Sequence, residues 1–247
     1  MDTLIKTITR TARAVTRSCG VDIVRFQPLS TTLLGQRGLL MRNAGINLVF
    51  DVGANIGQFG SELRVLDYQG EILSFEPQKG AFEQLSAAAA ADPKWRAYHY
   101  AFGEVPGTTT INLSQNSHSS SLLDMRAAHL ESAPESAYIG QEEIEVRTLN
   151  DFWQENGPTY SNRKIMLKID VQGFEKYVLA GAADFLPHVS LIQLEMSLVE
   201  LYNGEMLYLE MMAYLRSLGF GELLSLMPGH SNPSTGRLLQ VDGVFGR

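Results

Sequence analysis

Four residues in the first third of the chain have the types and the spacing of a nucleoside-binding site. The apolar run 48–50 is followed by Asp51, and two glycines, Gly53 and Gly57, come shortly after it. This order is typical of a buried strand that ends in a tight turn, where the backbone approaches a nucleotide closely. Glu76 lies 19 residues after Gly57, where such folds hydrogen-bond a ribose. The alternative is that Gly53 only forms a turn and Glu76 only caps a helix.

The same turn argues against a dinucleotide as the bound ligand. A dinucleotide-binding turn has three glycines in the pattern G-x-G-x-x-G, and this segment has only Gly53 and Gly57. A carboxylate at Asp51 would repel phosphates, but it would accept hydrogen bonds from a hydroxyl or an ammonium group. S-adenosylmethionine carries both groups and no phosphate. The segment therefore predicts that Asp51, Gly53, Gly57 and Glu76 bind S-adenosylmethionine, with a nucleotide-binding oxidoreductase as the alternative from another class.

Further acidic residues follow the same architecture. Asp170 and Glu195 each end an apolar run. Because the carboxyl ends of parallel strands meet at one edge of a sheet, we expect these two residues to converge there with Asp51 and Glu76. Asp242 lies in the last apolar run, and this edge and a solvent-facing position are equally favoured for it. Repulsion within such a cluster is offset by a cation, either the sulfonium and ammonium of the donor or a divalent metal.

The elements that would position these residues alternate from residue 46 onward. We expect strands at residues 46–52, 71–75, 96–102, 108–113, 143–148, 165–169, 189–194, 223–227 and 238–245. We expect helices at 57–66, 79–91, 149–155, 174–180 and 207–218, and a short one within 125–138. This alternation predicts a mostly parallel α/β sheet with helices on both faces, and its last two strands predict an antiparallel hairpin. The expected organisation is a helical extension over 1–45 and one domain over 46–247.

Composition narrows the class of protein. The chain has 247 residues, of which 45% are hydrophobic, and a net charge of −7. The acidic balance argues against a nucleic-acid partner. Since no apolar run is long enough to span a bilayer, no integral membrane segment is expected. The single cysteine, Cys19, and the absence of a secretory pattern predict a cytoplasmic protein.

Residues 1–25 form a basic segment in this acidic chain, with five basic and two acidic side chains. Leu4, Ile8, Ala12 and Val15 recur at helical spacing, which predicts an amphipathic helix with a basic face. Such a helix could make peripheral contact with an anionic membrane or an acidic glycolipid. We favour the other interpretation, packing on the body of the protein or on a second copy in a homodimer, because the apolar face has no Trp or Phe.

The motifs, taken in order, resemble those of the FkbM family of S-adenosylmethionine-dependent O-methyltransferases. The residues that carry the resemblance are Asp51-Val-Gly-Ala-Asn-Ile-Gly57, Ser74-Phe-Glu-Pro77, Ala101-Phe-Gly103, Ser119-Ser-Ser-Leu122, Leu167-Lys-Ile-Asp-Val-Gln-Gly-Phe-Glu175, Gln193-Leu-Glu195 and Gln240-Val-Asp-Gly-Val-Phe245. The resemblance covers residues 46–245 and implies the class I methyltransferase fold, a Rossmann-like seven-stranded sheet with its last strand antiparallel. It also implies methyl transfer to hydroxyls of sugars, polyketides or other natural products.

The resemblance further implies residues for the donor site. Its motifs add Asn55, Ala101, Phe102 and Ser120 to the donor-binding residues named above, together with Asp170. No role is carried over to residues 1–45, which lie outside the motifs.

A metal is implied by the resemblance as well. Related sugar O-methyltransferases use Mg²⁺, which prefers oxygen ligands, and the implied ligands are Asp170 and Glu195, with Asp242 as a third. The family position after Val171 is often Glu, whereas this chain has Gln172, so that carboxylate is missing from the set.

The reaction also needs a group that takes up the proton of the hydroxyl. Of the five histidines, His118 in the serine-rich segment 115–126 and His230 in the loop 228–237 are expected to reach the ligand edge. Asp170 is a third catalytic candidate, through the metal. The open alternatives are a metal-independent enzyme, in which the carboxylates only position the donor, and a protein that kept the fold but lost catalysis. A carbohydrate or glycolipid acceptor is expected, and the sequence does not identify it.

Overall fold

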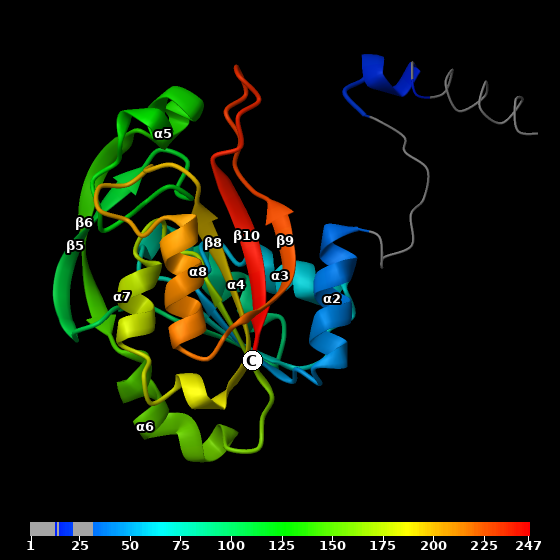
Figure 1. The fold of residues 1–247 in the computed structure, drawn as a ribbon, viewed down its shortest axis with the longest axis vertical. Helices are drawn as coiled ribbons and strands as arrows, with labels where there is room; N and C mark the ends of the chain where they lie inside the picture. Colours follow the sequence, from blue (N-terminus) through cyan, green and yellow to red (C-terminus); the bar gives the residue numbers. More distant parts are fainter. Residues whose placement is uncertain (1–12, 14, 22–31) are drawn as a thin grey trace, which may run out of the picture.

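The apolar runs form one seven-stranded sheet in the computed structural model, which describes residues 13, 15–21 and 32–247 (Figure 1). Its strands are β1 (Leu48–Val52), β2 (Glu71–Phe75), β3 (Trp95–Tyr98), β7 (Ile165–Ile169), β8 (Val189–Ser197), β9 (Glu222–Pro228) and β10 (Gln240–Gly246). Their order is β3-β2-β1-β7-β8-β10-β9, and β10 runs in the direction opposite to the other six strands. The predicted class I methyltransferase sheet is confirmed. Its strand order reverses between β1 and β7, where open α/β sheets bind ligands.

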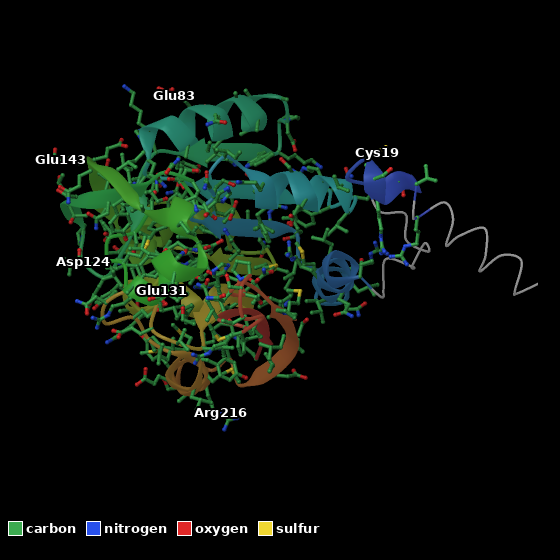
Figure 2. The ribbon with its side chains drawn as sticks, turned by 90° about the horizontal axis from the view of Figure 1, so that it is seen from above. Cys19, Glu83, Asp124, Glu131, Glu143 and Arg216 are labelled. Atoms are coloured by element: carbon green, nitrogen blue, oxygen red, sulfur yellow. The ribbon has the colours of Figure 1, made fainter. Side chains whose placement is uncertain are left out.

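Helices cover both faces of the sheet, because the side chains of each strand alternate between two apolar layers. One layer contains Phe50 and Leu167, and the other contains Val49 and Met166. The first layer packs on α6 (Leu149–Tyr160), α7 (Glu175–Ala180) and α8 (Tyr208–Ser217), the second on α2 (Leu33–Asn43), α3 (Gln58–Val65) and α4 (Lys79–Ala90). Figure 2 shows these layers from above, with Glu83 of α4 on one side of the sheet and Arg216 of α8 on the other.

A second sheet, of three strands, was not expected from the sequence. It contains β4 (Ala101–Phe102), β5 (Gly107–Ser114) and β6 (Tyr138–Arg147) in the order β4-β6-β5. The strand expected at 96–102 is therefore divided, since β3 pairs with β2 whereas β4 pairs with β6. Strand β6 begins five residues earlier than expected because all of β5 pairs with it. Between the two lie the serine-rich segment and α5 (Ala127–Ser132).

The N-terminal part of the chain is described only in part. Residues 15–18 are helical, and most of the predicted basic helix lies outside the described residues. Helix α2 begins after Thr32, whose hydroxyl accepts a hydrogen bond from Gly35 N at 3.0 Å and so caps the helix. The division of the chain at residue 46 stays a prediction. Within the described ranges, no helix is both long and apolar enough to cross a membrane.

Candidate functional site

Two tight turns meet at the carboxyl edge of the sheet. Gly53, directly after β1, has a φ of +75°, and a Cβ there would lie 1.9 Å from the carbonyl oxygen of Asp170, directly after β7. Asp170 N in turn donates to Val52 O at 3.0 Å. Only glycine allows the two strand ends to approach this closely. Gly57, with a φ of +92°, has a different role, because a Cβ there would meet Leu85 and Trp95 at 3.1 Å, in the apolar layer under α3.

A cavity of about 390 Å³ opens beside these turns, within the size range of small-molecule sites. One part of its wall is apolar and comes from the second sheet and the serine-rich segment, with Phe102, Ile111, Leu122 and Ile144. Polar side chains at the ends of β2, β7, β8 and β10 line another part, and residues of α2 and α3 also border the cavity. Among the residues expected at the donor site, Gly53, Asn55, Glu76, Ala101, Phe102, Ser120 and Asp170 line the cavity, whereas Asp51 and Gly57 do not.

Glu76 is fixed at the end of β2 by two backbone donors. Its Oε2 accepts a hydrogen bond from Asn55 N and its Oε1 from Gln78 N, each at 2.8 Å. The side chain is 2% exposed, and this burial raises the pKa of Glu76 to about 7 despite the backbone donors. Each carboxylate oxygen keeps a further acceptor position. Glu76 is therefore placed to accept hydrogen bonds from two hydroxyls of one ligand.

Asp51 lies behind the glycine turn rather than in the cavity. It is fully buried, receives a hydrogen bond from Ser74 Oγ at 3.0 Å and pairs with Lys168 Nζ at 3.0 Å. The same ammonium group donates to Gly53 O at 2.9 Å. Burial alone would lower the pKa of Lys168, but Asp51 and Asp170 raise it. Asp51 thus does not line the cavity, and its partner Lys168 also holds the Gly53 carbonyl. That Asp51 contacts the ligand stays a prediction.

The remaining carboxylates meet around an amide. Asp170, Glu195 and Asp242 line the cavity, and Asp242 lies opposite Glu195 in the β10–β8 register. Gln172 Nε2 donates to Asp170 Oδ1 at 2.8 Å and to Glu195 Oε2 at 3.1 Å. Gln240 Nε2 donates to Glu195 Oε2 at 2.7 Å. Burial, together with Asp170 and Asp242, raises the pKa of Glu195 well above its usual range.

This arrangement does not fit the expected Mg²⁺ site. The ion would need ligand oxygens at about 2.0–2.1 Å, and the Gln172 amide nitrogen occupies the space between Asp170 and Glu195 that it would fill. In the part of the chain that the structure describes, no three acidic, histidine or cysteine side chains are arranged to hold a metal ion. The amide supplies hydrogen-bond donors where the sequence suggested a cation.

The glycine turn after β7 is held by an acid that the sequence did not single out. Glu175 Oε1 accepts hydrogen bonds from Val171 N at 3.2 Å and from Gly173 N at 3.3 Å. Burial raises the pKa of Glu175 to about 8. Its contacts fix the backbone of the turn between Asp170 and α7.

The two candidate histidines lie in different places. His118 lines the cavity. Its segment is connected to the turn at residues 53–57, here called the donor turn, by a 3.3 Å hydrogen bond between Asn55 Nδ2 and Ser117 Oγ. His230 does not line it. Its Nε2 lies 2.9 Å from Ser132 Oγ, and its ring stacks on His129 at 5.9 Å. The expectation for His230 is corrected, because its loop packs against α5.

Arg37 is a cavity residue that sequence reasoning missed. It comes from α2, its guanidinium lies 4.8 Å from the centre of the Phe59 ring, and its Nη1 donates to Glu62 Oε2 at 3.0 Å. Nothing in the spacing of residues 33–43 marks this arginine, since it belongs to no motif. Its position follows only from the packing of α2 beside α3.

The chain is similar to known methyltransferases. The methyltransferase FkbM domain matches residues 51–221. The 2-O-methyltransferase NoeI of Sinorhizobium fredii is 25% identical over 187 residues, which span 73% of this chain and 74% of that protein. Among solved structures, TehB from Haemophilus influenzae has a TM-score of 0.46 at 10% identity, covering 88% of this chain and 63% of that one. A putative RNA methyltransferase from Pyrococcus horikoshii has a TM-score of 0.45 at 10% identity, covering 87% and 83%.

The domain match extends over more than half of the chain, from Asp51 near the end of β1 to the residue before β9. It includes the Glu76 strand end, the Asp170 turn and the carboxylate of Glu195. The chain belongs to the FkbM methyltransferase family and is an S-adenosylmethionine-dependent methyltransferase.

Proposed function

We propose that the chain transfers the methyl group of S-adenosylmethionine to a hydroxyl oxygen of a sugar, glycan or glycolipid. The observation that carries the proposal is the polar wall next to the donor turn, where Asp170, Gln172, Gln193, Glu195 and Asp242 line one cavity. Such a group of carboxylates and amides can hydrogen-bond several hydroxyls of one acceptor at once. The resemblance to a 2-O-methyltransferase supports oxygen as the methylated atom.

The donor would lie with its ribose hydroxyls on Glu76 and its adenine against the apolar wall of Phe102, Ile111 and Ile144. Glu76 and this wall border the same cavity, so one ligand can reach both. The amino-acid part of the donor would then pass Gly53, whose lack of a side chain leaves the turn open to a ligand. This orientation brings the sulfonium methyl toward Asp170.

In the transfer step, the acceptor oxygen attacks the methyl carbon in line with the carbon–sulfur bond, which breaks and releases S-adenosylhomocysteine. The hydroxyl proton must leave as the new bond forms. We assign its uptake to Asp170, whose side chain is 40% exposed and is held by Gln172 Nε2 at 2.8 Å. His118, which also lines the cavity, is the alternative base.

We also propose that the reaction is metal-independent. The Gln172 amide and the Lys168 ammonium group offset the charge of Asp170, at 2.8 and 3.5 Å. One ammonium group and one neutral amide donor of this chain therefore take the role that the sequence suggested for Mg²⁺.

The test is methyl transfer from labelled S-adenosylmethionine to a panel of sugars and glycolipids, with and without EDTA. We expect the label on an acceptor oxygen, one S-adenosylhomocysteine per methyl group and equal rates with and without EDTA. Asp170→Asn should lower kcat by about 10²–10⁴-fold. The matched control is Asp184→Asn, an exposed aspartate outside the cavity, which should keep the parent rate.

Three outcomes would oppose these assignments. Label on nitrogen or carbon would overturn O-methylation. Loss of activity in EDTA with recovery on adding Mg²⁺ would overturn metal independence. A parent rate in Asp170→Asn, with a large loss in His118→Ala, would move the base to the histidine.

A further inference from the structure

Acidic side chains outnumber basic ones in the lining of the cavity. Among the described lining residues, five are acidic and two, Arg37 and Lys168, carry a permanent positive charge, while His118 lines the cavity as well. The acidic ones are Glu62, Glu76, Asp170, Glu195 and Asp242. S-adenosylmethionine carries a carboxylate at its amino-acid end, so part of the donor must be bound inside a wall that repels it. A carboxylate there needs a positive partner with hydrogen-bond donors that are not already used.

The two basic residues differ in what they can still bind. Lys168 Nζ contacts Asp51 Oδ1 at 3.0 Å, Gly53 O at 2.9 Å and Asp170 Oδ2 at 3.5 Å. Of the three donors of this ammonium group, one is hydrogen-bonded to Gly53 O, and the other two contacts are ion pairs with Asp51 and Asp170. Its charge is therefore already balanced by two carboxylates.

Arg37 keeps hydrogen-bond donors that are available to a ligand. Its side chain is nine-tenths buried, only its Nη1 pairs with Glu62, and its Nε has no partner among the described residues. A guanidinium has five N–H donors and binds a carboxylate through two parallel hydrogen bonds. Arg37 is thus the basic lining residue that can still accept an anion.

The contacts around the donor turn also give an order along the cavity. Glu76 accepts from Asn55 N at 2.8 Å, next to Gly53 on the same turn. Gly53 O is held by Lys168 Nζ, which lies 5.5 Å from the centre of the Phe59 ring. The guanidinium of Arg37 lies 4.8 Å from the same ring centre. We therefore expect a donor that is anchored by its ribose on Glu76 and extends past Gly53 to bring its amino-acid end toward Phe59 and Arg37, which line the same cavity.

We propose that Arg37 of α2 binds the carboxylate of the methionine portion of S-adenosylmethionine. The proposal rests on the proposed function, and it extends the donor site to a helix that lies before the residues matched by the family, 51–221. Phe59 supports the guanidinium from one side through a cation–π contact, and Glu62 holds Nη1. Helix α2 would then order the donor site as well as cover the sheet.

The experiment compares the dissociation constants of S-adenosylmethionine and decarboxylated S-adenosylmethionine, by titration calorimetry, for the parent, Arg37→Gln and Arg37→Lys. The parent should bind the decarboxylated compound less tightly. Arg37→Gln should weaken S-adenosylmethionine by roughly ten- to hundredfold and leave the decarboxylated compound within about twofold of the parent. Arg37→Lys should lie in between, because lysine keeps the charge but not the paired donors. The control is Arg42→Gln, an exposed arginine of the same helix, which should bind as the parent does.

Each alternative gives a distinct result. Equal weakening of both compounds in Arg37→Gln would assign Arg37 a structural role and overturn the proposal. If Arg37→Gln binds the donor as the parent does but has a raised KM for acidic acceptors and not for neutral ones, Arg37 binds a carboxylate of the acceptor. This result would overturn the proposal too. Failure of the parent to bind S-adenosylmethionine would oppose the proposed function itself. Thermal unfolding of each variant separates these results from loss of the fold.

Discussion

Replacing Gly53 by alanine should weaken the binding of S-adenosylmethionine by at least roughly a hundredfold. A φ of +75° costs an alanine about 1–2 kcal/mol, and its Cβ would lie 1.9 Å from Asp170 O. The turn cannot move away freely, because Lys168 Nζ holds Gly53 O and Asp170 N holds Val52 O. Any relaxation must therefore displace Asp170 as well, so both the donor turn and the proposed base change position.

Donor titration and thermal unfolding of Gly53→Ala measure this effect. The matched control is Gly80→Ala in α4, where a Cβ meets nothing within 4 Å, and alanine in a helix is favoured by about 1 kcal/mol. The control should bind the donor as the parent does, with equal or higher stability. A folded Gly53→Ala protein with the parent dissociation constant would show that the donor does not pass this turn.

Replacing Lys168 by methionine should lower the free energy of unfolding by about 3–5 kcal/mol, because it leaves the buried Asp51 carboxylate without its ion-pair partner. Lys168 is the single positive group that contacts Asp51 at 3.0 Å within the described residues, and Asp51 is fully buried. The double variant Asp51→Asn/Lys168→Met should recover much of the loss, since it removes the uncompensated charge. Urea unfolding measures all three proteins.

A matched control for this prediction comes from an exposed lysine. Lys94→Met, at an exposed lysine whose Nζ donates to Gln69 O at 3.1 Å, should change stability by no more than about 0.5 kcal/mol. Equal small effects at both lysines would mean that the Asp51–Lys168 ion pair does not stabilise the fold.

Local sequence patterns were enough to predict most strands of the large sheet and the residues at their ends. Glu76 and Asp170 were predicted because each ends an apolar run, and a parallel sheet sends all such ends to one edge. The second sheet was missed because β4, with two residues, is too short to show a period and pairs with β6, 45 residues later in the chain.

The partners within the site could not be predicted in the same way. Asp51 and Lys168 lie opposite each other in the β1–β7 register, a pairing over 117 residues that no local spacing reveals. Gln172 shows its role only through the two carboxylates that its amide contacts. The packing of α2 places Arg37 at the cavity, and contacts with α5 hold His230 away from it. Each of these depends on tertiary contacts rather than on residue type.

The most direct test of the account is the dissociation constant of S-adenosylmethionine between about pH 6 and pH 8, for the parent protein and Glu76→Gln. Burial raises the pKa of Glu76 to about 7, so its carboxylate is mostly protonated at the lower pH and ionised at the higher. Ribose hydroxyls donate to the ionised form more strongly, and the parent should therefore bind up to roughly tenfold more tightly at the higher pH. Glu76→Gln should bind at least tenfold more weakly than the parent there, and without this dependence on pH. Equal affinity and an equal pH profile in the two proteins would contradict the placement of the donor in this cavity.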